Sequence, residues 1–456
     1  MHKNSFLLLL LATSLFAAAQ PRLPKNYYWK KLNNGLEVVV IENNRVPLAT
    51  IEIAVKNGAF TEGPEYSGLS HLFEHMFFKA NKDYPDQERF IRRTEELGAI
   101  WNGTTGTERV NYFFTFDKDS LEAGLNFMNS AMRFPIYRPE DMTKERPVVD
   151  GEFQRGESDP FFQLWYESQK KLWGDLYTRK IAIGDHHIIN TATPEKMMII
   201  KDKYYHPNNS VLVITGDVKK EDAFRLAEKI FGDWANSGFD PHEKYPIPDF
   251  TSLTKNEYFI KESSIAQTPY IMINWHGPEY RKDSAATLYA DVFSTALGLN
   301  SSKWQQALID KGLATYAGIN YQTNRYIGPI QIMVVPNPTK LKECYTELMN
   351  QIAQFSDPNY LTDEQLQTAK EILIRNEIRS NEKPSSLSMN LTYWWASTSL
   401  DYFTDYVPNM MKVTKQDITN YVNKYIKAKP FVAGMIISPE MNKQLAPGEY
   451  FKGKDF

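Results

Sequence analysis

The chain has 456 residues, which is enough for two or three domains of ordinary size and a substantial core. Its 42% hydrophobic and 23% charged residues are typical of a soluble globular protein, and a net charge of −3 disfavours nucleic acid or an anionic membrane as a partner. Cys344 is the only cysteine, so an intramolecular disulfide and a thiolate metal cluster are excluded.

Residues 1–20 are typical of a cleaved signal peptide. Lys3 provides a short positive region, Phe6 to Ala19 form an apolar run, and Ala17 to Ala19 offer a small-residue cleavage site. The apolar run is too short for a permanent membrane span, so we expect no span in the mature chain. An exported protein without disulfides fits the periplasm best, and we therefore expect a periplasmic or secreted protein.

The first half, residues 21–235, is expected to mix strands and helices. Alternating apolar and β-branched residues after position 28 predict strands joined by hairpin turns at Asn34-Gly35 and Asn57-Gly58. Residues 66–80 have apolar residues at helical spacing, which predicts a helix. The remaining patterns of this half predict helices over 86–98, 121–134, 139–156 and 220–234, and strands over 110–120 and 210–218.

Residues 236–254 contain three prolines without periodicity, which indicates a linker. The second half, residues 255–456, then runs through the same kinds of element. Its patterns predict strands over 267–277 and 431–440, a hairpin over 316–336, and helices over 284–298, 340–355 and 363–380. The fold class predicted is therefore α+β, with two similar halves that arose by internal duplication, the second lacking the metal motif described next.

The stretch SGLSHLFEHMFFKA, residues 67–80, carries His71 and His75 with Glu74 beside the second histidine. Residues four apart share one face of a helix, so both imidazoles can point at one metal ion. Glu74 lies three residues after His71 and can take a proton from a metal-activated water. The H-x-x-E-H order is the inverzincin arrangement of zinc peptidases.

A structural interpretation of the same turn stays open at this point, because a pair of helical histidines is more often part of a core or a surface than a metal site. A catalytic zinc also needs a third protein ligand. The other histidines lack partner spacing, and we expect them in loops or in the core: His186, His187, His206, His242 and His276.

The segments NGLEVVVIEN and GAFTEGPEYSGLSHLFEHMFFKA resemble the opening of the pitrilysin/insulinase family, which includes the mitochondrial processing peptidases. The resemblance continues through YYHPNNSVLVITGDV and VTKQDITNYVNKYI, and so covers nearly all of the mature chain. It implies two α+β halves that form a clamshell around a chamber. It also implies Glu152 as the third zinc ligand and Glu145 as a second glutamate that supports the catalytic site.

The same resemblance implies further substrate contacts. Asn102 matches the family's substrate-anchoring asparagine on an edge strand, which can hold an extended peptide, although a turn asparagine before Gly103 explains it equally well. Tyr316 matches a substrate-binding tyrosine of the second half. Ile309 stands where many relatives have an arginine, so a partner chain that completes the substrate clamp is a hypothesis.

These observations predict an exported zinc metalloendopeptidase that hydrolyses unfolded peptides with one Zn²⁺ per chain, either as a homodimer or with a related chain as a heterodimer. The alternative is a non-catalytic peptide-binding or structural subunit of a pitrilysin-type complex. A carbohydrate-binding or adhesive module has only the 13% aromatic content in its favour.

Overall fold

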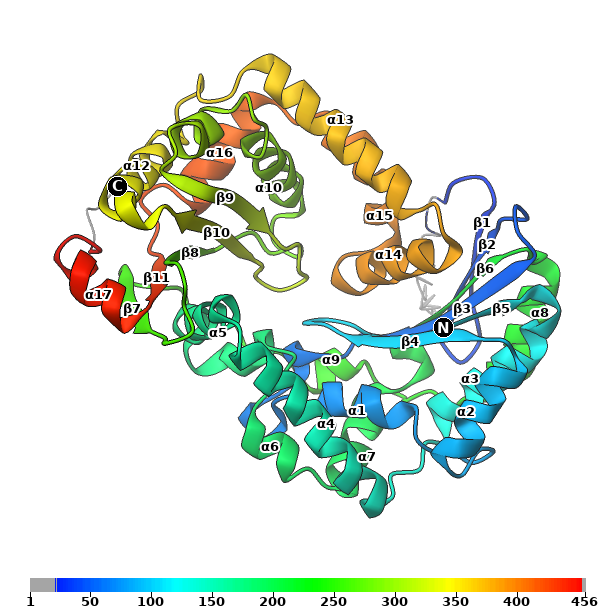
Figure 1. The fold of residues 1–456 in the computed structure, drawn as a ribbon. Coiled ribbons are helices and arrows are strands. Elements are labelled where there is room, and N and C mark those ends of the chain that lie inside the picture. Colours follow the sequence, from blue (N-terminus) through cyan, green and yellow to red (C-terminus); the bar gives the residue numbers. More distant parts are fainter. Residues whose placement is uncertain (1–20, 22, 453–456) are drawn as a thin grey trace, which may run out of the picture.

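Two β-sheets, one in each half of the chain, organise the fold (Figure 1). The computed structural model describes residues 21 and 23–452, so the expected signal peptide lies outside the described residues. The first sheet has the order β1-β2-β6-β3-β5-β4, and only the β2–β6 pair is parallel. Its strands are β1 (Tyr27–Lys31), β2 (Glu37–Glu42), β3 (Leu48–Val55), β4 (Ile100–Thr105), β5 (Val110–Asp117) and β6 (Ser210–Gly216).

The second sheet repeats this plan. Its order is β7-β11-β8-β10-β9, and its one parallel pair, β7–β11, corresponds to the β2–β6 pair of the first sheet. The order matches β2-β6-β3-β5-β4 strand for strand, with β1 as an additional edge, so the predicted α+β class with two similar halves is confirmed. The strands are β7 (Glu257–Glu262), β8 (Tyr270–His276), β9 (Ala314–Tyr321), β10 (Pro329–Pro336) and β11 (Val432–Ile437).

Helices surround both sheets. Those of the first half are α1 (Leu69–Phe77), α2 (Gln87–Glu96), α3 (Leu121–Arg133), α4 (Pro139–Glu157), α5 (Pro160–Trp173), α6 (His186–Asn190), α7 (Pro194–Tyr204), α8 (Lys220–Phe231) and, inside the expected linker, α9 (Pro241–Lys244). Those of the second half are α10 (Ser284–Leu297), α11 (Lys303–Gln305), α12 (Leu341–Gln354), α13 (Asp363–Ser380), α14 (Pro384–Ser397), α15 (Leu400–Met410), α16 (Lys415–Tyr425) and α17 (Pro439–Leu445). No helix among the described residues is long and apolar enough to cross a membrane.

One predicted hairpin is wrong. The turn at Asn34-Gly35 does join β1 to β2, and Gly35 adopts a φ of 93° that favours glycine. By contrast, the chain leaves the sheet at Asn57-Gly58 and continues through short 3-10 turns to α1. The strand β6 from much later in the sequence lies between β2 and β3, a long-range pairing that local periodicity cannot reveal.

The two halves exchange one helix each. Helix α5 of the first half packs on β8 and β11 of the second sheet, and α14 of the second half packs on β3 and β6 of the first sheet (Figure 1). The second contact buries Leu387, Leu391 and Trp395 against apolar side chains of the first sheet, among them Val39, Ile41, Ala54, Val211 and Val213. The exchange fixes the two halves to each other through apolar burial.

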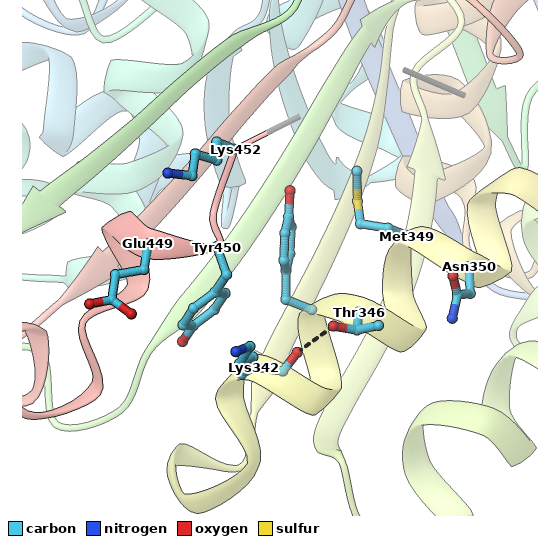
Figure 2. A pocket seen from close by; sticks show the side chains of 8 residues that line it. Lys342, Thr346, Met349, Asn350, Glu449, Tyr450 and Lys452 are labelled. Atoms are coloured by element: carbon cyan, nitrogen blue, oxygen red, sulfur yellow. Dashed lines mark hydrogen bonds between the residues drawn. The ribbon is translucent and has the colours of Figure 1, made fainter. Parts of the chain in front are cut away.

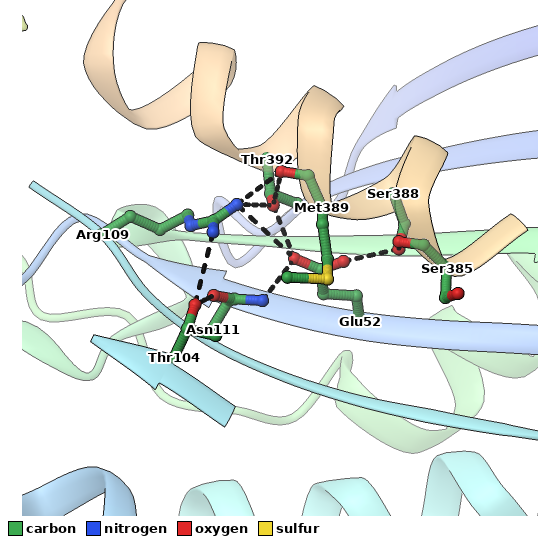
Figure 3. Close-up of polar contacts among 8 residues, drawn as sticks. All are labelled: Glu52, Thr104, Arg109, Asn111, Ser385, Ser388, Met389 and Thr392. Atoms are coloured by element: carbon green, nitrogen blue, oxygen red, sulfur yellow. Dashed lines mark hydrogen bonds and ion pairs between the residues drawn. The ribbon is translucent and has the colours of Figure 1, made fainter. Parts of the chain in front are cut away.

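A buried polar cluster strengthens the contact between α14 and the first sheet (Figure 3). Glu52 on β3 is fully buried and accepts hydrogen bonds from Ser388, Thr392 and Asn111 at 2.5, 2.5 and 2.9 Å. The guanidinium of Arg109 lies 4.0 Å from the Glu52 carboxylate. It also donates a hydrogen bond of 2.5 Å to the main-chain carbonyl of Met389 on α14. Burial raises the pKa of Glu52, and these donors and the cation oppose that shift.

Candidate metal centre

Helix α1 presents two different faces. Its apolar residues, including Leu72, Phe73 and Met76, are buried in the core of the first half, while His71 and His75 face a cavity. The helix begins after Gly68, whose φ of 87° favours glycine and whose Cα lies against Gly184, where a side chain would collide. These features fix the position of the histidines.

Glu62 caps the first turn of α1. Its two carboxylate oxygens accept hydrogen bonds from the main-chain N–H groups of Gly68 and Ser70 at 2.7 and 2.6 Å. Such groups at a helix start have no partner within the helix, so a carboxylate here satisfies them and interacts favourably with the helix dipole. The cap anchors the helical turn that carries the first histidine, His71.

Helix α4 brings Glu152 to this face of α1. The Oε2 atom of Glu152 lies 3.5 Å from Nε2 of His71 and 3.9 Å from Nε2 of His75. One ligand atom from each of the three residues falls within 4.8 Å of the others, and no other such group is found within residues 21 and 23–452. The structure therefore brings together the three residues that the sequence analysis assigned to a metal.

The electrostatics of the two imidazoles differ. Burial, together with the neighbouring His75, lowers the pKa of His71 to about 4, so this imidazole is neutral near pH 7. Burial also acts to lower the pKa of His75, but the hydrogen bond to Glu145 and the nearby carboxylates raise it overall. A metal cation bound between the two imidazoles would take the place of the proton that the nearby carboxylates stabilise on His75.

The donor set fits a zinc ion. Two imidazoles and one carboxylate are a ligand set of catalytic zinc, which keeps a further position open for water. The Nδ1 atom of His75 is occupied by Glu145 at 2.8 Å, which directs Nε2 toward Glu152. The Nε2 atom of His71 faces the same oxygen, although its buried Nδ1 has no hydrogen-bond partner among the described residues.

Glu74 lies beside this cluster and is buried. Its Oε2 accepts a hydrogen bond of 2.8 Å from the hydroxyl of Thr105 on β4. Gly103 on the same strand leaves room for the carboxylate, since a Cβ at this position would lie 2.8 Å from Cγ of Glu74. Burial raises the pKa of Glu74, which suits a carboxylate that takes up and returns a proton.

Two polar residues of this site escaped the sequence analysis. Lys79 places Nζ 2.5 Å from Oε2 of Glu145, and together with His75 it lowers the pKa of Glu145 against the opposing effect of burial. The signal for Lys79 was its spacing of four residues from His75. The signal for Thr105 was its alternation with Gly103 on one face of a strand.

The cavity at the cluster has a volume of about 500 Å³. Asn102 lines it, and its side-chain oxygen accepts a hydrogen bond from the N–H of Gly103 at 2.9 Å. Tyr316 lies on the edge strand β9 of the second half, 53% exposed, and does not line this cavity. Ile309 packs against the core of the second half. The substrate contacts expected of Asn102 and Tyr316 stay predictions.

The spacing of His186 predicted no interacting partner, but in the structure the imidazole has two acidic neighbours. His186 starts α6, and its two ring nitrogens lie 2.5 Å from Asp150 and 3.2 Å from Glu157, both on α4. His186 therefore holds the outer face of the helix that carries Glu152. Of the remaining histidines, His242 and His276 are stacked on aromatic rings, as expected for structural residues.

A cavity of comparable size, about 470 Å³, lies in the second half between α12 and the last described residues (Figure 2). Its lining includes Lys342, Met349, Glu449 and Tyr450 but no histidine. The lining residues therefore offer no metal-ligand set of the kind found on α1 and α4.

Two models of one peptidase family match the chain. Residues 38–169 match the family model described as Insulinase (Peptidase family M16), and residues 191–373 match the model described as Peptidase M16 inactive domain. A protein of Rickettsia felis named an uncharacterized zinc protease is 24% identical, over 91% of this chain and 98% of its own length.

Solved structures have the same fold. A protease from Helicobacter pylori has a TM-score of 0.81 at 20% identity, covering 91% of this chain and 99% of that chain. The periplasmic protease PqqL from Escherichia coli has a TM-score of 0.74 at 14% identity, covering 96% of this chain but 51% of that chain. This chain therefore corresponds to about half the length of that protein.

Proposed function

The chain belongs to the pitrilysin/insulinase family of peptidases, and on this premise we propose that it is a zinc metalloendopeptidase acting on unfolded peptides. The observation that carries the proposal is the convergence of His71, His75 and Glu152, whose ligand atoms lie within 4.8 Å of one another. Glu74 lies next to them with a carboxylate in a buried environment. In this proposal the first three residues hold one Zn²⁺ and Glu74 is the general base.

When bound, zinc supplies Lewis acidity, which makes water nucleophilic near neutral pH and polarises a peptide carbonyl. The residues of the chain then handle the proton. Thr105 occupies Oε2 of Glu74, so Oε1 is the oxygen free to accept a proton from the attacking water. The same oxygen returns the proton to the leaving amine.

In this proposal Glu145 orients a metal ligand, and the strand β4 holds the substrate. Glu145 holds the ring of His75 by its Nδ1, which keeps Nε2 directed at the metal position. The strand β4 pairs with β5 on one side only, so its free edge can add an extended peptide by main-chain hydrogen bonds. Asn102 on this strand would then contact the substrate beside the cluster.

The test is zinc content together with peptide hydrolysis in the wild type and in Glu74→Gln. We expect the variant to keep one zinc per chain and to lose hydrolysis by about 10²–10⁴-fold, the usual contribution of a general base. Glu95→Gln, on the exposed surface of α2, is the matched control and should keep full activity. A Glu74→Gln protein that binds zinc and hydrolyses peptides normally would refute the assignment.

A non-catalytic peptide-binding or structural subunit is the second candidate. It is favoured by the match of residues 191–373 to a model described as an inactive domain. The two functions differ in one observable: the non-catalytic subunit binds peptide but leaves it intact even with zinc supplied.

The proposal extends to location and partners. The resemblance in fold to a periplasmic protease, and the signal-like residues 1–20, support an exported protein. Because this chain spans about half of that neighbour, we further propose that a second chain, identical or related, completes the assembly. Size measurement of the purified protein, alone and with a candidate partner, tests this part.

A further inference from the structure

A second, smaller cavity lies at the end of β4, beyond the metal cluster. It has a volume of about 190 Å³ and shares Thr104 and Thr105 with the cavity of the cluster. The two cavities therefore adjoin at the end of β4, and the smaller one extends along the turn that follows it. The smaller cavity begins at Thr104, the residue after Gly103, and Gly106 on its wall lies three residues from Gly103, which is about 10 Å along an extended chain at about 3.3 Å per strand residue.

Both halves of the chain build the walls of this cavity. The first half contributes the turn from Gly106 to Arg109, and the second half contributes Gln322, Asn324, Tyr393 and Ser397. The hydroxyl of Tyr393 donates to the main-chain carbonyl of Thr323 at 2.6 Å, which ties α14 to the loop between β9 and β10. A peptide held on β4, as proposed above, would therefore meet residues of the second half in this cavity.

The charged groups at the walls are already paired. Glu108 is buried and accepts hydrogen bonds from the main-chain N–H groups of Arg325 and Tyr326 at 2.7 and 3.0 Å. The guanidinium of Arg109 donates to Thr392 at 2.7 Å and lies near the carboxylate of Glu52. A charged ligand group finds no free counter-charge among these residues, so the cavity suits a neutral one.

Asn324 supplies the unused hydrogen-bonding capacity. Its side chain is 1% exposed, and its Oδ1 has no hydrogen-bond partner among the described residues. A buried amide oxygen without a partner is costly, and a peptide main chain offers both a donor and an acceptor to a side-chain amide. The chemistry of the cavity therefore matches an uncharged stretch of polypeptide.

We infer that this cavity is a subsite for the main chain of a peptide substrate about three residues from the bond to be cleaved, with Asn324 as its hydrogen-bonding residue. The inference rests on the proposed peptidase function. It gives the second half a direct contact with substrate, and it predicts that peptides too short to reach Asn324 bind weakly.

Binding of fluorescent alanine-based peptides of increasing length tests the inference. The peptides are titrated into the full-length, zinc-loaded Glu74→Gln protein, so that turnover does not interfere, and Kd is read from anisotropy. We expect Kd to fall at least tenfold once the peptide extends three or four residues to one side of its centre. Asn324→Leu should abolish this gain and leave the Kd of short peptides unchanged.

Gly106→Leu is an independent variant that fills the cavity. A Cβ at Gly106 meets only the carbonyl oxygen of Arg109 at 3.7 Å, which is ordinary contact, and the length gain should again disappear. Asn359→Leu, in an exposed loop, is the control and should retain the gain. Thermal unfolding of each variant verifies that the chain is folded.

The possible results separate the two proposals. A Kd that does not depend on length, or a gain that survives in both cavity variants, overturns the subsite. A length gain that vanishes in the variants supports it, even if the wild-type protein hydrolyses none of the peptides. In that last case the peptidase function fails while the subsite stands.

Discussion

Glu145 on α4 accepts a hydrogen bond of 2.8 Å from Nδ1 of His75, and its other carboxylate oxygen lies 2.5 Å from Nζ of Lys79. The carboxylate is nearly buried, so its charge depends on these two partners. The contact orients the imidazole through the nitrogen that faces away from the metal cluster. Lys79, just beyond the end of α1, therefore affects the proposed metal indirectly, through Glu145 and then His75.

Removal of Lys79 is predicted to weaken zinc binding. In Lys79→Met the Glu145 carboxylate loses its cation and holds His75 less firmly, and we expect a 10–100-fold loss of zinc affinity, typical of lost outer-shell contacts. Competition with a chelator measures the affinity. Lys79→Arg should restore most of it, and Lys144→Met, an exposed lysine of α4, should have no effect. Equal affinity in Lys79→Met and the wild type would contradict the prediction.

Loss of the Thr105 hydroxyl is predicted to slow hydrolysis without affecting the metal. Thr105→Val keeps the shape of the side chain but removes the hydrogen bond to Glu74. A bond of about 1.4 kcal/mol corresponds to roughly a tenfold decrease in kcat. Zinc content should be unchanged, and Thr105→Ser should recover the rate. A change in KM alone would instead indicate a role in substrate binding.

The cluster around Glu52 is predicted to contribute strongly to stability. Arg109→Met leaves a buried carboxylate without its cation, which costs about 3 kcal/mol or more in the free energy of unfolding. The double variant with Glu52→Gln should recover part of the loss, because no buried charge remains. Urea unfolding gives these free energies. Arg92→Met, which breaks an exposed ion pair with Glu88, should change stability by less than about 0.5 kcal/mol.

Stability is predicted to fall between about pH 4 and pH 7 through Asp291. Burial raises the pKa of this carboxyl to about 7, although the hydroxyl of Tyr406 donates to it at 2.8 Å. In the unfolded chain Asp291 loses its proton near pH 4, so over this window the folded state binds more protons and a rising pH favours unfolding.

Asp291→Asn removes this titration. We expect the variant to gain stability relative to the wild type between pH 4.5 and pH 8, by at least about 1.4 kcal/mol, the equivalent of one pKa unit. Urea unfolding at both pH values gives the difference. An equal pH dependence of the two proteins would show that Asp291 is ionised in the folded state throughout this range.

Local patterns in the sequence predicted many of the helices and strands and the pair of metal-binding histidines. The apolar stripe and the spacing of His71 and His75 predicted α1, and helical spacing predicted α13 over 363–380, where the structure has it. Both signals depend on neighbours within one or two turns, which a linear sequence displays directly. Glu152 was added by resemblance to the family, because no local rule connects positions so far apart.

Only the tertiary structure decided how distant segments meet. The exchanged helices α5 and α14, the insertion of β6 between β2 and β3, and the contacts of Lys79 and Thr105 were all absent from the sequence analysis. Each depends on which surfaces pack together, and burial of apolar area is non-directional, so the sequence pattern marks a face as buried without naming its partner. The residue types of a metal centre were therefore visible in the sequence, while their neighbours and the cavities beside them were set by packing.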